Sequence, residues 1–457
     1  MKNLILNIKE LKEYSEEDLP YEFSNNPKIQ NQLFKHNYIT YENGYYKFKY
    51  VGIILIGNLI IKCYPKYIQT KNENEIERLF SQVLKVIMKY DSTHEDPYET
   101  NELDDEYFNK LSLSLFFIED YYENGSYRKI QNILETNGNG EINWNKTIND
   151  NNVIIENNRP YYTDLQTVHK INEVNNYFRL LHECIITECS QFLEKYDLLN
   201  LFDLTAVELS ENNLEDFGEY DFLLRKLEKE LNIEFNTHKR KLIKYMHTYI
   251  SEKKSFTEED TLTVYGTSTF NNIWEEVCCK VLNDQLRNEL GQISLPIQLS
   301  NDYKSETKLI KLIKKPKWHL NSEDVATDQQ EEIDIEKNTL IPDLVTTTSD
   351  EFIILDAKYY NLKLENNKLS GQPGIESITK QYFYELAFKH FIDLHNFKHT
   401  RNAFLFPTDE DKLINMGYVE LDFIKKLQKI QVIKLPAKKM YEYYLKNMTL
   451  IIKEWRL

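Results

Sequence analysis

Residues 341–360 read IPDLVTTTSDEFIILDAKYY and predict two strands, about Leu340–Thr346 and Glu351–Tyr359, joined by a polar turn. The four residues before Asp356 are all apolar, which is typical of a central strand covered on both faces. Asp356 and Lys358 are two residues apart, so their side chains project to the same face. An acid and a lysine at the end of a buried strand are costly unless they pair or bind a cation.

Phosphodiester hydrolysis gives these residues a chemical reason. Carboxylates hold one or two Mg²⁺ ions through oxygen ligands, and the metal polarises the phosphoryl oxygens and lowers the pKa of its water. Asp343, on the neighbouring strand, is the expected bridging ligand, and Asp356 is the second. The backbone carbonyl of Ala357 is available as a third oxygen, and Lys358 orients the water or neutralises developing charge. We therefore expect a Mg²⁺-dependent site in which Mn²⁺ substitutes.

Two predicted helices flank this hairpin. The upstream helix, Thr269–Asn283, offers Glu275 and Glu276; Glu275 falls nearer the margin of the apolar stripe and is the preferred additional carboxylate. In the downstream helix, from about Ile378 to Phe391, Gln381 is expected to position water or a metal-bound carboxylate.

The order of the predicted elements indicates the fold. After the second helix, Asn402–Phe406 reads as an apolar strand stopped by Pro407, so helix, hairpin, helix and strand indicate an α/β core with a mixed sheet. A bare acid/lysine string is often only a strand-end ion pair. The apolar strand and the two flanking helices make a nuclease site the better interpretation.

The remaining chain divides into an N-terminal β-rich region (1–75) and a mostly helical middle (76–255), followed by the predicted nuclease region (256–457). Residues 36–67 predict a small β-meander with turns at Asn43-Gly44 and Gly57-Asn58. Helical periodicity marks three stretches, 76–90, 168–196 and 222–250. The Asn/Gly-rich segment 137–148 is a DNA-reading loop, a projection that engages a partner or a plain surface hairpin, and these alternatives stay open.

Composition restricts the class of protein. The 457 residues carry a net charge of −17, which argues against a polybasic nucleic-acid binder. Acidic residues concentrate in segments 91–106, 203–221 and 323–336, whereas residues 411–457 carry a net charge of +5. The lysines spaced along 304–317 predict a helix with one basic face, which either meets phosphates or is simply solvated.

Cellular location follows from cysteine use and apolar runs. The five cysteines show no CxxC spacing, which favours a reduced compartment. The longest apolar run, residues 51–61, is too short to span a bilayer. A cytoplasmic protein without a membrane partner is expected.

Several segments resemble a known family. PDLV, ILDAKYY, GQPGIESITKQYFYELAF and AFLFP are similar to the nuclease domain of the LlaJI-type restriction endonucleases, which resemble the McrC subunit of McrBC systems and belong to the PD-(D/E)xK nuclease superfamily. YKFKYVGIILIGNLIIKCYPKYI, NGNGEINWNKTI and NRPYY extend the resemblance into the N-terminal half.

The resemblance implies a DNA-cleaving subunit of a restriction system for phage defence. It implies double-stranded DNA as substrate, a separate McrB-like AAA+ GTPase as partner, and a cognate cytosine methyltransferase encoded alongside. The motif residues carry over as Asp343, Asp356 and Lys358, with Glu275 and Gln381 matched less surely. The chain has no phosphate-binding loop of its own, so any GTP dependence is expected to come from the partner. A stand-alone homodimeric endonuclease and a non-catalytic adaptor that activates a GTPase are the alternatives.

Overall fold

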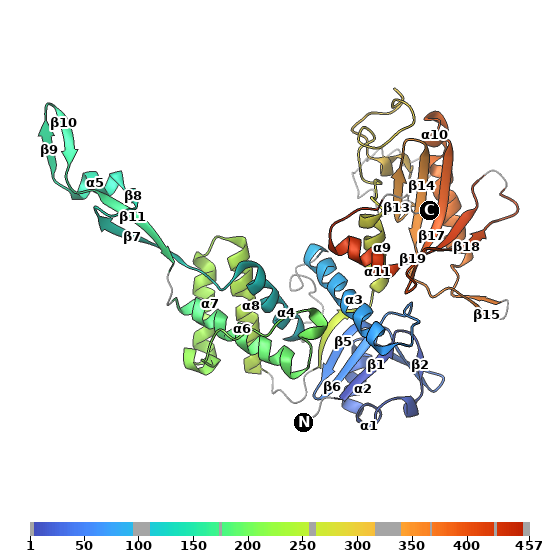
Figure 1. Ribbon diagram of the computed structural model, residues 1–457, viewed down its shortest axis with the longest axis horizontal. Coiled ribbons are helices and arrows are strands. Elements are labelled where there is room, and N and C mark those ends of the chain that lie inside the picture. Colours follow the sequence, from blue (N-terminus) through green and yellow to red (C-terminus); the bar gives the residue numbers. More distant parts are fainter. Residues whose placement is uncertain are drawn as a thin grey trace, which may run out of the picture. The chain divides into compact units, whose positions relative to one another are not determined.

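The structure is a computed structural model that describes residues 4–94, 110–172, 176–255, 262–315, 340–365, 368–424 and 427–450. The chain forms two compact units. Unit 1 comprises Met1–Asn3, Leu55–Asn58 and Glu106–Tyr265, and unit 2 comprises Leu4–Ile54, Leu59–Asp105 and Gly266–Leu457. Figure 1 shows the elements of both units. None of the helices in the described ranges is both long and apolar enough to cross a membrane.

A five-stranded mixed sheet forms the C-terminal part of unit 2, in the order β13-β14-β17-β19-β18. Its strands are β13 (Leu344–Thr347), β14 (Glu351–Ala357), β17 (His399–Thr408), β18 (Ile414–Val419) and β19 (Ile430–Pro436). The three inner strands β14, β17 and β19 run parallel, and β13 and β18 are antiparallel to their neighbours. The predicted α/β core with a mixed sheet is confirmed at this level.

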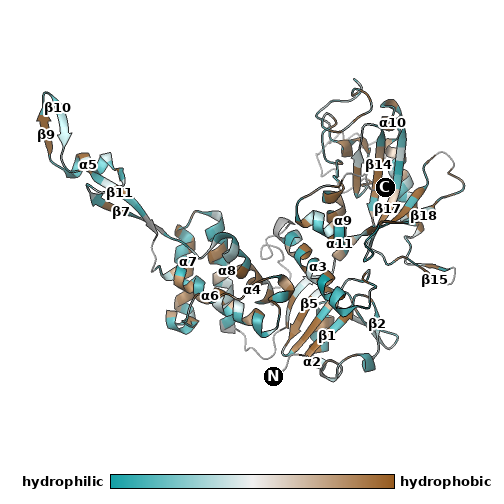
Figure 2. Cartoon of the chain, viewed as in Figure 1, coloured by the Kyte–Doolittle hydropathy of each residue, from teal (hydrophilic) through white to brown (hydrophobic). Residues whose placement is uncertain are grey.

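The apolar run before Asp356 lies inside the sheet, as its composition predicts. Every residue from Glu351 to Asp356 is buried, and Figure 2 shows hydrophobic residues along β14 and β17. The prediction that Pro407 ends its strand is wrong: β17 continues to Thr408, and Pro407 is paired with Leu435 of β19. Proline has no backbone N–H and so donates no hydrogen bond, but the pairing of β17 with β19 continues past it.

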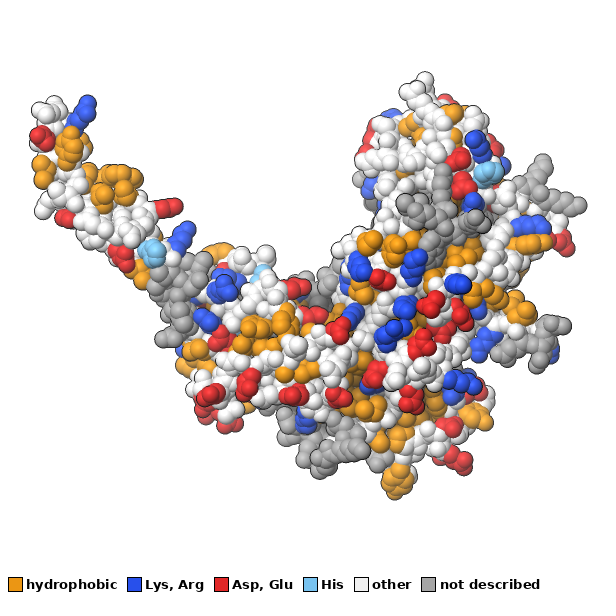
Figure 3. Space-filling model, viewed as in Figure 1, with side chains coloured by type: hydrophobic (Ala, Val, Ile, Leu, Met, Phe, Trp, Pro, Cys, Tyr) orange, Lys and Arg blue, Asp and Glu red, His pale blue; other side chains and the backbone are white. Residues whose placement is uncertain are grey.

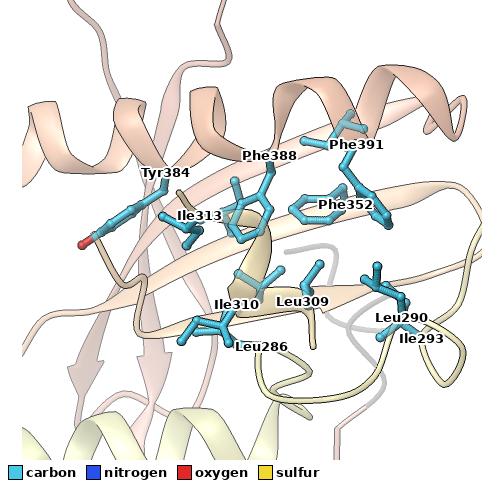
Figure 4. Close-up of a cluster of buried hydrophobic side chains, with 13 residues drawn as sticks. Leu286, Leu290, Ile293, Leu309, Ile310, Ile313, Phe352, Tyr384, Phe388 and Phe391 are labelled. Carbon is cyan, nitrogen blue, oxygen red and sulfur yellow. The ribbon is translucent and has the colours of Figure 1, made fainter. Parts of the chain in front are cut away.

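Three helices accompany this sheet: α9 (Phe270–Val281), α10 (Ile375–Leu394) and α11 (Ala437–Leu445). One face of β14 and helix α10 share a core in which Phe352, Phe388 and Phe391 are almost fully buried (Figure 4). The loop after α9 completes this core with Leu286 and Leu290. The same loop therefore fixes α10 and β14 relative to each other.

The N-terminal segment, residues 4–64, contributes strands to two sheets where one meander was predicted. Strands β3 (Ile39–Glu42) and β4 (Tyr45–Phe48) join β2 (Glu13–Tyr14), whereas β5 (Val51–Ile56) and β6 (Leu59–Tyr64) join β1 (Leu4–Lys9) and β12 (Leu262–Thr267). Both predicted turns are confirmed as hairpins, and Asn43 and Gly44 both have positive φ, as a type I′ turn requires. The meander fails because β1 pairs in parallel with β6, a long-range pairing that no local pattern reveals.

Short helices and one long helix complete this part of unit 2. They are α1 (Tyr21–Ser24), α2 (Pro27–Lys35) and α3 (Glu73–His94), and the last confirms the helix predicted for 76–90. Helix α3 contacts α11, where the amide Nε2 of Gln82 donates to the carbonyl of Lys438 at 2.8 Å.

Unit 1 is built on a group of helices: α4 (Lys110–Asn124), α6 (Tyr177–Lys195), α7 (Tyr220–Ile233) and α8 (Thr237–Ser255). Two sequence predictions need correction here. The helix predicted from residue 168 begins at Tyr177, because residues up to Asn172 form β11 (Gln166–Asn172) paired with β7 (Ile130–Thr136). The helix predicted over 222–250 is two helices, separated by residues 234–236.

A β-finger extends from these helices (Figure 1). It consists of β7 and β11, the short strand β8 (Glu141–Ile142), helix α5 (Trp144–Asp150) and a terminal hairpin of β9 (Val153–Glu156) and β10 (Arg159–Tyr162). The Asn/Gly-rich segment lies in this finger. A Cβ at Gly140 would lie 2.2 Å from the carbonyl oxygen of Val168, so only glycine fits between β8 and β11.

The basic helix predicted over 304–317 is wrong for the described residues up to 315. A four-residue 3₁₀ helix, Leu309–Leu312, is the only helical turn there, and it buries Leu309 and Ile310 in the core of Figure 4. Burial of these two residues outweighs the helical spacing of the lysines. The acidic segment 323–336 and most of 91–106 lie outside the described residues.

Candidate active site

The hairpin β13-β14 brings the two predicted aspartates together. Leu344 pairs with Leu355 in the antiparallel register, so the preceding Asp343 lies across from the following Asp356. Oδ2 of Asp343 accepts a hydrogen bond of 2.8 Å from the backbone N–H of Ala357. The register of one hairpin therefore places both carboxyl groups at the same end of the sheet.

Lys358 directly follows β14 and pairs with Asp356. Its Nζ lies 2.5 Å from Oδ2 of Asp356, and both side chains are mostly buried. The backbone N–H of Lys358 donates to the carbonyl of Leu405 at 2.8 Å, which extends the parallel pairing with β17 by one residue. The same carbonyl accepts from Nε1 of Trp274 on α9 at 3.2 Å.

Helix α9 presents the two neighbouring glutamates differently. Burial raises the pKa of Glu275, and the nearby carboxylate of Asp356 raises it further. Glu276 instead lies 3.6 Å from Lys280, one turn along the same helix. Of the two glutamates, Glu275 is therefore the one with a described interaction with the aspartates, and its catalytic role stays a prediction.

The site carries more negative than positive charge. Burial raises the pKa of Asp343 to about 8, and the carboxylates of Asp356 and Glu275 add to this effect, whereas Lys358 opposes it. Three carboxyl groups thus lie near one ammonium group. Bringing a divalent cation into such a group favours ionisation of all three acids.

The donor set suits Mg²⁺, which is usually held by one or two carboxylates and keeps several waters. Within the described residues, however, no three His, Cys, Asp or Glu side chains are arranged to hold a metal ion together as they stand. Lys358 contacts Asp356, and the Ala357 N–H contacts Asp343. Metal binding through Asp343, Asp356, Glu275 and the Ala357 carbonyl remains a proposal.

Gln381 lies in α10 and is completely buried. Its Nε2 is 3.5 Å from the carbonyl oxygen of Ile354, two residues before Asp356, and its Oε1 has no hydrogen-bond partner among the described residues. The structure thus places this amide against the backbone of β14. Its predicted role in positioning water or a carboxylate stays a prediction.

Sequence reasoning did not assign a role to Tyr384 or Asp284. Burial strongly raises the pKa of Tyr384 on α10, and the charges of Asp356, Asp343 and Glu275 add to the rise. Figure 4 shows the Tyr384 hydroxyl pointing away from the apolar cluster. The helical spacing could have indicated Tyr384 as a further site residue, because it follows Gln381 by three residues and shares its face of the helix.

Asp284 follows α9 and holds β13. Its Oδ1 accepts from the backbone N–H groups of Val345 at 2.9 Å and Leu286 at 3.1 Å. Gln285 binds the same strand, since its Oε1 accepts from both the N–H and the hydroxyl of Thr347. These contacts fix β13, and therefore Asp343, from the side opposite β14. Nothing in the spacing of the sequence links residue 284 to 345.

Residues 50–438 match the LlaJI restriction endonuclease family. The chain is also 29% identical over 432 residues to a Bacillus subtilis (strain 168) protein described as "Type II restriction enzyme BsuMI component YdjA"; the match covers 91% of this chain and 85% of that protein.

Two solved structures are similar at low identity. A chain of a half-complex of Thermococcus gammatolerans McrB AAA+ hexamers with bound McrC has a TM-score of 0.40 and 11% identity, over 97% of this chain and 99% of that chain. A chain of the Thermococcus gammatolerans McrBC complex has a TM-score of 0.27 and 12% identity, over 59% of this chain and 84% of that chain.

Proposed function

This chain belongs to the LlaJI restriction endonuclease family, and from that premise we propose that it is the DNA-cleaving subunit of a restriction system, with its active site at Asp343, Asp356 and Lys358. The observation that carries the proposal is the register of β13 and β14, in which two acids from adjacent strands meet beside a lysine. We also propose that the mixed sheet is a PD-(D/E)xK nuclease core, and the two acids beside a lysine support this proposal. The proposed reaction is hydrolysis of phosphodiester bonds in double-stranded DNA in the cytoplasm.

Each residue has a distinct proposed task. Asp343 and Asp356 supply carboxylate oxygens, and Glu275 adds a third acid from α9. Lys358, at present paired with Asp356, would turn to the scissile phosphate or to the attacking water when the acids bind a cation. Its ammonium group would then orient that water or offset the charge that develops on the phosphate. Tyr384 and Gln381 would flank the site from α10.

Mg²⁺, or Mn²⁺ in its place, would supply Lewis-acid polarisation of the phosphate and a water of lowered pKa. The support for a cation is the excess of carboxylates and the raised pKa of Asp343. The backbone carbonyl of Ala357 is the proposed additional oxygen ligand.

We also propose a separate AAA+ GTPase as partner, which would bind GTP and deliver DNA, and a methyltransferase that protects host DNA. The resemblance to McrC is the reason for this partner. The β-finger offers it an apolar surface: Trp144, Ile148, Ile154 and Ile155 are each at least half exposed, and Figure 3 shows hydrophobic side chains along the finger. Exposed apolar residues on a soluble segment are typical of an interaction site. Engagement of the partner is therefore our preferred role for segment 137–148.

The test is cleavage of supercoiled, unmodified plasmid by the full chain with its partner GTPase, GTP and Mg²⁺. Asp356→Asn should abolish cleavage while DNA binding persists, and Asp393→Asn, an exposed acid on α10, serves as a matched control that should cut normally. Cleavage by Asp356→Ala at the wild-type rate would refute the assignment.

Two further arms separate the alternatives. Cutting that needs neither partner nor GTP would indicate a stand-alone endonuclease. Stimulation of the GTPase by a chain that neither cuts nor binds a divalent cation at Asp343 and Asp356 would indicate an adaptor.

A further inference from the structure

Tyr359, the residue after Lys358, is held by a group from the opposite end of the chain. Its hydroxyl donates a short hydrogen bond to Oε2 of Glu10, which lies 349 residues away and directly follows β1. Tyr359 is 6% exposed and Glu10 is 9% exposed. Water therefore has little access to replace this bond if it is lost, and a buried group left unpaired is costly. Both residues belong to unit 2.

Lys66 contacts both members of this pair. Its backbone N–H donates to Oε2 of Glu10 at 3.2 Å, and its Nζ lies 3.8 Å from Oε1 of Glu10 and 4.1 Å from the ring centroid of Tyr359. Its carbonyl accepts from Nδ2 of Asn361 at 3.3 Å. Glu10, Lys66 and Tyr359 thus form a closed polar group, which we call the Glu10 cluster.

The ring of Tyr359 is also held by apolar packing. It packs against Phe270 of α9 with ring centroids 5.1 Å apart and against Tyr67 at 6.4 Å. Apolar packing alone would keep the ring buried. The hydroxyl bond adds a directional constraint, because a hydrogen bond weakens steeply when its geometry changes.

Lys358 lies between two anchored neighbours. On one side the N–H of Ala357 is bonded to Asp343, and on the other the hydroxyl of Tyr359 is bonded to Glu10. The N–H of Lys358 itself is bonded to Leu405. Its flexible side chain therefore starts from a backbone that is fixed on both sides, which limits where Nζ can reach.

We propose that Glu10 and Tyr359 are positioning residues that fix Lys358 for cleavage, so that the segment after β1 sets the geometry of the active site. The inference rests on the proposed function of Lys358. Neither residue touches the acids or the scissile phosphate in this proposal; they act through the backbone that carries Lys358.

The test compares Tyr359→Phe, Glu10→Ala and Glu10→Gln in the full chain. Tyr359→Phe removes only the hydroxyl, and Glu10→Ala removes its acceptor. Glu10→Gln keeps an oxygen that can accept the same bond and serves as the conservative rescue. Tyr67→Phe is the matched control, because it alters a buried tyrosine of the same aromatic group that does not bond to Glu10.

Single-turnover cleavage with partner, GTP and Mg²⁺ gives the first readout. We expect Tyr359→Phe and Glu10→Ala each to slow cleavage about tenfold, the loss expected when a catalytic group is slightly misplaced, while DNA affinity stays unchanged. Glu10→Gln and Tyr67→Phe should cut at nearly the wild-type rate. The double variant Glu10→Ala/Tyr359→Phe should be no slower than Glu10→Ala alone, since Glu10→Ala already removes the bond to the Tyr359 hydroxyl.

The second readout does not need cleavage. Competitive acylation of lysines in the full chain, followed by mass spectrometry, measures the access of reagent to Lys358 without partner or metal. Lys358 should react several-fold faster in Tyr359→Phe and Glu10→Ala than in the wild type, with exposed Lys380 as internal reference. If the wild type does not cut, the nuclease proposal fails, and a changed labelling rate would still support positioning.

Equal labelling of Lys358 in all variants would overturn the inference, whatever the cleavage result. So would wild-type single-turnover rates in both Tyr359→Phe and Glu10→Ala. If Tyr359→Phe does not fold, the comparison of Glu10→Ala with Glu10→Gln decides in the same way, because a loss confined to Glu10→Ala requires the accepting oxygen.

Discussion

Replacing Asp343 by asparagine should stabilise the metal-free protein and abolish cleavage at the same time. Asparagine keeps an oxygen that can accept the N–H of Ala357, so the hydrogen bond at 2.8 Å is preserved. It cannot ionise, so the cost of a buried charge beside Asp356 and Glu275 disappears. Active-site residues that cost stability are expected where function requires unfavourable charge.

The magnitude follows from the pKa of Asp343, which is raised from 3.8 to about 8, mainly by burial. A carboxyl group whose pKa is raised by folding contributes stability below its unfolded pKa, and this contribution is lost as the pH rises toward the folded value. Each pH unit between these limits changes the free energy of unfolding by about 1.4 kcal/mol. As the pH rises from 5 to 7, the free energy of unfolding of Asp343→Asn should therefore increase by up to about 3 kcal/mol relative to that of the wild type. This is an upper limit, because Asp343 is partly exposed.

The assay is urea-induced unfolding in EDTA at pH 5, 6 and 7, followed by pulsed hydrogen exchange of peptides from β13 and β14. These peptides report on unit 2 alone, which matters because a chain of two units need not unfold in one step. Asp393→Asn is the control and should show no pH-dependent gain. Added Mg²⁺ should raise the stability of the wild type more at pH 8 than at pH 6, because the cation binds the ionised acid, and should not stabilise Asp343→Asn.

If the difference in free energy of unfolding between Asp343→Asn and the wild type stayed constant from pH 5 to pH 7, the reasoning would be refuted. It would mean that Asp343 titrates alike in the folded and unfolded chain. A decreasing difference would mean that Lys358, not burial, dominates the pKa of Asp343.

Three further predictions concern close packing and buried contacts in the two units. Gly140→Ala should distort the β-finger, because its Cβ would meet the carbonyl of Val168 at 2.2 Å; faster hydrogen exchange in β8 and β11, with unchanged exchange in α6, would be the sign, and unchanged finger exchange would contradict it. Glu230→Ala should destabilise unit 1 by about 2 kcal/mol, measured by urea unfolding against Glu228→Ala, because Glu230 is buried and bonded to Tyr127 and Lys129. Phe352→Ala should cost unit 2 about 3–5 kcal/mol by removing a fully buried ring from the core of Figure 4; a loss below 1 kcal/mol would show that the core refills the space.

Local sequence determined the elements that carry the candidate site. The all-apolar run before Asp356 required a covered strand, and the spacing of Asp356 and Lys358 put both side chains on one face. The turn dipeptide Asn43-Gly44 fixed a hairpin, because both residues tolerate positive φ. Such signals are readable because periodicity and turn chemistry act over a few residues.

Tertiary structure decided what pairs across the chain. Residues 168–172 became a strand because β7, more than 30 residues earlier, offers it a partner. Within the described residues up to 315, the lysines form no α-helix because Leu309 and Ile310 enter the core against α10. Burying an apolar side chain contributes more free energy than the helix propensity of a residue, so burial decides the structure where the two conflict.

The sequence by itself thus determined the hairpin, its acids and the lysine beside them, because each depends on the alternation of one strand. Only the tertiary structure decided that Asp284 holds β13, that the acids raise the pKa of Tyr384 and that Glu10 bonds to Tyr359. The Asp284 and Glu10 bonds join residues 61 and 349 positions apart, and their energy comes from burial and directional bonds that no local pattern encodes.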